Sequence, residues 1–141
     1  MEPRADAASG LPSALELASA PVVAVRGDLD AMDALREMYR MGAHHLAVLG
    51  GSSAGLVTAV DLLFGIAGRV PGEAVPVESL CRRPAPDVEA DAAGGVAAQR
   101  MVEAGTDALF VTVDDEVRGV LTAVDLVRAV AERAVPQREE E

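Results

Sequence analysis

The 141-residue sequence contains no tryptophan, no lysine and a single cysteine, and aromatic residues make up only 2% of it. One cysteine, Cys81, excludes a disulfide within the chain and favours a reducing compartment, where a small buried side chain is its simplest role. All twelve basic residues are arginines, scattered along a chain whose formal net charge is -11. Without a basic stripe or stacking aromatic residues, nucleic-acid binding is disfavoured.

Long uninterrupted apolar runs are also missing. The longest uncharged stretch, residues 41–60, is broken by the glycines and serines of residues 50–55, so we expect two strands around a turn and no membrane span. Residues 1–10 carry Glu2, Arg4 and Asp6 and lack the apolar core of a signal peptide. We therefore expect a cytoplasmic protein, with disordered tails at residues 1–10 and 136–141.

An internal repeat organises the chain. Gly55–Leu62 (GLVTAVDL) recurs as Gly119–Leu126 (GVLTAVDL), with six of the eight positions identical and Leu and Val exchanged at the other two. The similarity continues upstream after a one-residue shift, as in the match of Met38 with Met101. Two copies of one structural unit are therefore expected. The expected division is a first repeat at residues 11–68, a linker at 69–76 and a second repeat at 77–135.

Each copy shows the pattern of a strand, a helix, a β-hairpin and a second helix, which indicates an α+β fold. Asp28 or Asp30 can cap the first helix, and Gly42 is expected to end it. Gly94 and Gly95 lower helix propensity by about 1 kcal/mol each relative to alanine, so they weaken the matching helix or mark its frayed start. In the first copy, strands are expected at 22–26, 45–49 and 55–60, and helices at 31–41 and from residue 62. In the second copy, strands are expected at 86–90, 108–113 and 117–122, and helices at 92–104 and up to residue 134.

A β-α-β-β-α unit of about sixty residues, duplicated in tandem with Gly-hydrophobic-hydrophobic-Thr-x-x-Asp in both copies, resembles the cystathionine β-synthase (CBS) domain pair, or Bateman module. The resemblance covers roughly residues 14–135, and residues 15–25 and 77–88 fit the short helix and first strand that begin each CBS repeat. It implies two pseudo-twofold related repeats that form one compact module with two clefts between them. It also implies a regulatory module that binds an adenosine derivative, such as AMP, ADP, ATP or S-adenosylmethionine, and pairs into a homodimer.

The resemblance assigns roles to the duplicated motif. Asp61 and Asp125 would accept hydrogen bonds from ribose hydroxyls, and Thr58 and Thr122 would contact phosphate. A carboxylate makes charge-assisted bonds to a diol, and a helix N-terminus offers free N–H groups to phosphate. The same spacing also resembles a capping box, in which these side chains satisfy backbone N–H groups and nothing more. The two roles are not exclusive.

The two implied clefts are chemically unequal. His45 would reach phosphate in the first copy, with Arg26 or Arg118 as candidate neighbours, whereas Asp107 in the second copy would repel it, so a phosphorylated ligand should favour the first cleft. Phe110 stands where many CBS repeats have proline and could fill a cleft with its own ring. The remaining residues implied to line the clefts are Ala24, Val25 and Ala47.

The sequence shows little sign of catalytic chemistry. No nucleophile, phosphate-loop or zinc-protease motif is present, and His44 and His45 should point to opposite faces of a strand, so we expect no enzyme, no required cofactor and no metal. The alternative is a structural or dimerising module whose ligand clefts have degenerated. A regulatory module would need an effector protein, which the sequence does not identify.

Overall fold

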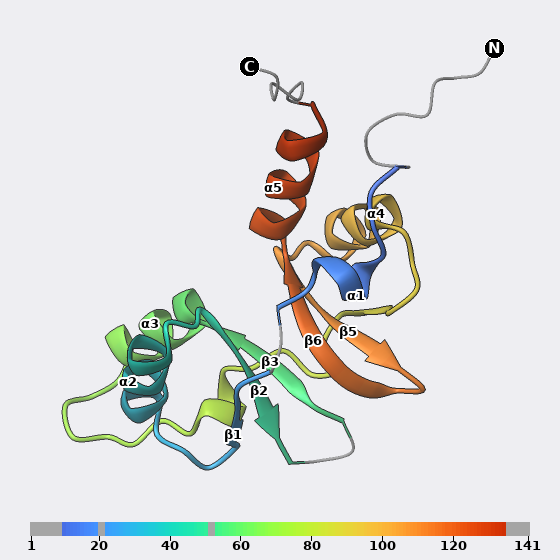
Figure 1. Ribbon diagram of the computed structural model, residues 1–141. Helices are drawn as coiled ribbons and strands as arrows, with labels where there is room; N and C mark the ends of the chain where they lie inside the picture. Colours follow the sequence, from blue (N-terminus) through green and yellow to red (C-terminus); the bar gives the residue numbers. More distant parts are fainter. Residues whose placement is uncertain (1–9, 20–21, 51–52, 135–141) are drawn as a thin grey trace. The chain divides into compact units, whose positions relative to one another are not determined.

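The computed structural model describes residues 10–19, 22–50 and 53–134, so most of the two expected tails lies outside the described residues (Figure 1). The described chain forms two compact units. The first-repeat unit runs from Val22 to Pro86, and the second-repeat unit combines residues 10–19 with the residues from Asp87 onward. None of the described helices is long and apolar enough to cross a membrane.

The first-repeat unit is a three-stranded sheet with two helices. The strand order is β1-β2-β3, with β1 parallel to β2 and β2 antiparallel to β3. Alternation along β2 sends Leu46 and Val48 into the core, where they pack with Val25 of β1 and Leu62 of α3. The elements are β1 (Ala24–Arg26), α2 (Ala31–Met41), β2 (His45–Leu49), β3 (Gly55–Thr58), α3 (Ala59–Ala67) and the short 3₁₀ helix η1 (Val77–Ser79).

The second-repeat unit has the same sheet topology, with β4 parallel to β5 and β5 antiparallel to β6. Leu109, Val111 and Leu121 form the centre of its core. The elements are α1 (Ala14–Leu17), β4 (Asp87–Glu89), α4 (Gly94–Ala104), β5 (Ala108–Val113), β6 (Glu116–Thr122) and α5 (Ala123–Ala134). The expected α+β fold with two repeats is confirmed.

Local signals account for most helix ends. Asp30, and not Asp28, caps α2 by accepting a hydrogen bond from the Met32 amide, and Gly42 ends the helix in the left-handed conformation at φ 68°. The predicted end of the third strand at residue 60 is wrong, because Thr58 is already the N-cap of α3. The helix predicted at residues 92–104 begins two residues later than predicted, at Gly94, and has no side-chain cap.

Each unit is completed by the segment that precedes the other repeat in the sequence. In the second-repeat unit, the Ala14 amide donates to the Ala92 carbonyl at 2.7 Å. In the first-repeat unit, the Val77 amide donates to the Leu29 carbonyl at 2.8 Å. Adding 63 to 14 and 29 gives 77 and 92, so these bonds are equivalent. The duplication therefore includes these lead-in segments. Residues 10–19, which lead into the first repeat, pack on the second repeat, and residues 77–86, which lead into the second repeat, pack on the first.

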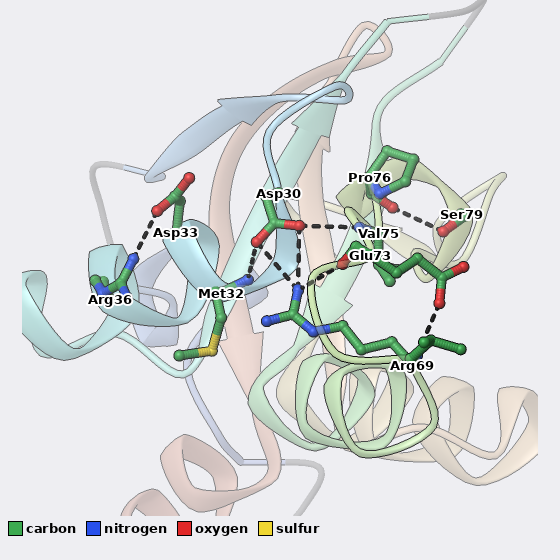
Figure 2. A network of polar contacts seen from close by, with 10 residues as sticks. Asp30, Met32, Asp33, Arg36, Arg69, Glu73, Val75, Pro76 and Ser79 are labelled. Atoms are coloured by element: carbon green, nitrogen blue, oxygen red, sulfur yellow. Dashed lines mark hydrogen bonds and ion pairs between the residues drawn. The ribbon is translucent and has the colours of Figure 1, made fainter.

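The expected linker, residues 69–76, is tied to the start of α2 (Figure 2). The Asp30 carboxylate accepts hydrogen bonds from the Val75 amide at 2.9 Å and from the Met32 amide at 3.0 Å, and Arg69 Nη1 lies 3.4 Å from both of its oxygens. Arg69 also donates to the Glu73 carbonyl. The hydrogen bond from Val75, followed by that from Met32 and the charge of Arg69, lowers the pKa of Asp30 below its ordinary value of 3.8 against the opposing effect of desolvation.

Candidate functional site

The first Thr-x-x-Asp motif joins the end of β3 to the start of α3. The Thr58 amide donates to Asp61 Oδ2 at 3.0 Å, and the Asp61 amide donates to Thr58 Oγ1 at 3.1 Å. These two bonds form a reciprocal capping box. Both side chains are half-buried, so the motif is partly exposed to solvent.

The second motif repeats this geometry between β6 and α5. The Thr122 amide donates to Asp125 Oδ2 at 2.9 Å, and the Asp125 amide donates to Thr122 Oγ1 at 3.2 Å. The capping box predicted as one role of the motif is therefore confirmed in both repeats. The additional role in ligand binding stays a prediction.

The two aspartates differ at their other carboxylate oxygen. Asp125 Oδ1 lies 3.4 Å from Arg128 Nη1, one helical turn along α5. Because the two motifs are 64 residues apart, the position of Arg128 in the first repeat is that of Phe64, whose side chain is 75% exposed. The Thr-x-x-Asp motif alone does not predict this contact of Arg128, although the two repeats already differ at this position, two residues beyond Leu126.

The strand pairing of the first-repeat unit places most of the other predicted residues of that repeat on one face of the sheet. His45 is paired with Thr58, and Ala24 is paired with Ala47, two residues further along β2. Side chains at paired positions and at every second position share one face of a sheet. Ala24, His45, Ala47 and Thr58 therefore lie on the face opposite the core, and with Asp61 they form what we call the first half-site. Val25 lies in the core, so it is not brought together with them.

The second half-site follows from the same register. Ala108 is paired with Thr122, and Asp87 is paired with Phe110. These four residues and Asp125 make up the second half-site. Compared with the first half-site, it has Ala108 in place of His45, Phe110 in place of Ala47 and Asp87 in place of Ala24. Phe110 is 2% exposed and the equivalent Ala47 is 4% exposed, so both positions are buried, and the phenyl ring occupies more of the volume there than the methyl group does.

The candidate arginines each have an acidic neighbour. Arg26 lies 2.7 Å from Asp28, and Arg118 lies 3.2 Å from Glu116, in both cases on exposed surface. Across residues 10–19, 22–50 and 53–134, no three His, Cys, Asp or Glu side chains are grouped so as to hold a metal ion.

The sequence matches the CBS domain family model twice, at residues 14–68 and 77–132. These matches cover most of the chain and coincide with the two copies found in the sequence. The chain therefore belongs to the CBS domain family and carries two CBS repeats in tandem. None of the curated proteins matches this chain.

Solved structures share this fold at low sequence identity. The CBS domain pair of protein MJ0100, in complex with 5'-methylthioadenosine and S-adenosyl-L-methionine, has a TM-score of 0.76 at 17% identity, over 87% of this chain and 98% of its own. A hexameric CBS-CP12 protein from bloom-forming cyanobacteria has a TM-score of 0.79 at 20% identity, over 92% of this chain and 74% of its own. A conserved protein from Pyrococcus horikoshii has a TM-score of 0.75 at 18% identity, over 89% and 96% respectively.

Proposed function

We propose that this chain is a non-catalytic regulatory module that binds an adenosine derivative at its Thr-x-x-Asp motifs. The observation that carries the proposal is the identical motif geometry in the two repeats, which presents a half-buried carboxylate beside a helix N-terminus each time. Capping uses Oδ2 of each aspartate, which leaves Oδ1 to other donors: Arg128 takes this place at Asp125, and a ligand could take it at Asp61. A ribose hydroxyl is a suitable donor, because hydrogen bonds to a carboxylate are charge-assisted.

The surroundings of the first motif suit the rest of such a ligand. Exposed Ala24 provides a small apolar surface for the adenine base on the sheet face that carries Thr58, and Ala47, although only 4% exposed, leaves more room behind it than a larger side chain would. His45, opposite Thr58, is a candidate contact for a phosphate group. The complex of the MJ0100 domain pair with 5'-methylthioadenosine and S-adenosyl-L-methionine supports adenosine compounds as the ligand class.

The net charge of -11 ranks the candidate ligands. Long-range repulsion disfavours the polyanion ATP relative to 5'-methylthioadenosine and S-adenosylmethionine, while AMP is intermediate. An adenosine compound at one hundred times its dissociation constant should stabilise the fold by ~2.7 kcal/mol. We expect at least one of AMP, ADP, ATP, 5'-methylthioadenosine and S-adenosylmethionine to raise the melting temperature by several degrees.

The variant Asp61→Asn separates binding from capping. Its amide oxygen can still accept the Thr58 amide, but its charge is lost, so we expect a folded protein whose affinity for the active compound is about tenfold lower by calorimetry. Thr58→Ser keeps the capping hydroxyl and is the matched control, with affinity close to that of the unchanged chain. If none of the five compounds gives heat or a thermal shift, the chain does not sense adenosine compounds.

A structural role is the second candidate function, and a specific surface favours it. The first turns of α3 expose Val60, Leu63 and Phe64, at 58%, 53% and 75%. The equivalent positions of α5 expose Val124 and Val127, at 62% and 66%. We call these two sets the apolar stripes, and we propose that they pair with a second copy of the chain. Dimerisation is compatible with sensing, and it becomes the main function if the ligand panel fails.

Signalling requires that the ligand binds one arrangement of the module more tightly than another. An effector protein in the cytoplasm would recognise that arrangement. A ligand can shift the equilibrium between the two arrangements by no more than the difference in its binding free energy for them. A ligand that binds both arrangements equally tightly would therefore carry no signal.

A further inference from the structure

The two half-sites carry the same capping box but different neighbours, and Arg128 is the difference nearest to the predicted ribose contact. Its Nη1 lies 3.4 Å from Asp125 Oδ1, the oxygen that capping leaves available. The Asp125 side chain is only 13% exposed, so that oxygen has little room for a second donor. A ligand hydroxyl would have to displace the arginine.

The sheet face of the second half-site adds two further obstacles. Phe110 places a buried ring where the first half-site has the methyl group of Ala47. Asp87, paired with Phe110, places an exposed carboxylate where the first half-site has the methyl group of Ala24, and this charge opposes phosphorylated ligands only. The competing donor and the filled volume oppose any adenosine ligand.

We propose that the chain binds one adenosine ligand, at the first half-site, and that Arg128 and Phe110 close the second. This inference rests on the proposed function and specifies which motif performs it. Asp125 then serves as the cap of α5 and the partner of Arg128, while Asp61, next to Phe64, keeps Oδ1 for the ligand.

Calorimetric titration with AMP and with S-adenosylmethionine tests the stoichiometry. We expect one equivalent per chain for the unchanged protein. Two equivalents would overturn this inference and leave the proposed function standing, whereas no binding of either compound or of the rest of the panel would overturn both.

The double variant Arg128→Phe/Phe110→Ala gives the second half-site the residues of the first at these positions, and we expect it to bind a second equivalent. If it is folded by circular dichroism and still binds one, Arg128 and Phe110 are not what closes the site.

An exposed position provides a test that does not disturb the core. Phe64→Arg installs the Asp125–Arg128 arrangement beside Asp61, and because an exposed ion pair is weak, we expect about two- to fivefold lower affinity. Leu63→Arg adds the same charge to the same apolar stripe, two residues from Asp61 and therefore on another side of α3, and should leave affinity unchanged. Because both positions belong to the stripe, light scattering should give the two variants the same oligomeric state. Equal affinities for the two variants would overturn the role of the arginine.

Discussion

At Asp30, one carboxylate joins three segments: the start of α2, the Arg69 side chain after α3, and the Val75 backbone 45 residues away. The bond from Val75, that from Met32 and the charge of Arg69 all favour the ionised form, which is why the pKa of Asp30 is lowered below 3.8. A carboxylate with a lowered pKa in the folded state stabilises the fold above its unfolded pKa, and that contribution is lost as the pH falls through its folded pKa.

Asp30→Asn tests this linkage. We expect the variant to have a lower free energy of unfolding than the unchanged chain at pH 7, and the difference to shrink as the pH falls below 3.8. Urea unfolding at pH 7 and at the lowest pH at which the chain remains folded measures both values. Asp33→Asn removes an exposed partner of Arg36 on the same helix and should change stability little at either pH. A difference for Asp30→Asn that is the same at both pH values would contradict the linkage.

Among the helices, the start of α4 is determined by the lead-in segment that packs on it. A Cβ atom at Gly94 would lie 2.8 Å from Leu11 Cβ, which is closer than real Cβ atoms approach, and 3.1 Å from Leu17 Cδ1, which is a tight contact. The Gly94 amide also donates to the Pro12 carbonyl at 3.1 Å. The glycine that weakens the helix in isolation therefore permits the close approach of residues 11–17.

Gly94→Ala has two opposing effects on the free energy of unfolding. Helix propensity improves by at most ~1 kcal/mol, while crowding against the Leu11 Cβ atom costs about 1–3 kcal/mol, so we expect net destabilisation in thermal or urea unfolding. Gly68→Ala is the control, because a Cβ there meets nothing closer than the Phe64 carbonyl oxygen at 3.4 Å and the residue has an ordinary helical φ of -88°. A stabilised Gly94→Ala variant would show that the lead-in yields easily.

On the scale of the whole molecule, the duplication places equivalent apolar stripes on α3 and α5. Their members recur at spacings of three and four residues, so each stripe lies along one side of its helix. Exposed apolar surface that recurs at equivalent positions of both repeats favours a repeated contact with another chain.

We expect the chain to sediment as a dimer at micromolar concentration and the double variant Leu63→Glu/Val127→Glu to sediment as a monomer, because an unpaired charge in an apolar interface is strongly unfavourable. Val102→Glu changes a valine of α4 that is 79% exposed and outside the stripes, so it should remain dimeric. If the unchanged chain is a monomer, the proposed pairing is refuted. If the double variant is still a dimer, the dimer interface lies on another surface.

Local patterns in the sequence were enough to predict the repeat, the order of elements, the α+β class and the capping boxes. The elements and the capping boxes depend on residues a few positions apart, such as Thr58 with Asp61, which cap the helix without a contact from a distant segment. The repeat depends on comparing two short segments of the sequence with each other. The chain's resemblance to the CBS family came from the same short-range motif, found twice.

Only the tertiary structure decided which lead-in completes which unit, that Asp30 holds Val75, and that Val25 enters the core while Ala24 lies on the other face. The first two outcomes involve partners 45 to 78 residues apart in the sequence. The third depends on the register of a strand to within one residue. The burial of whole faces selects among such alternatives, and a one-residue slip in register would exchange the two sides of the sheet.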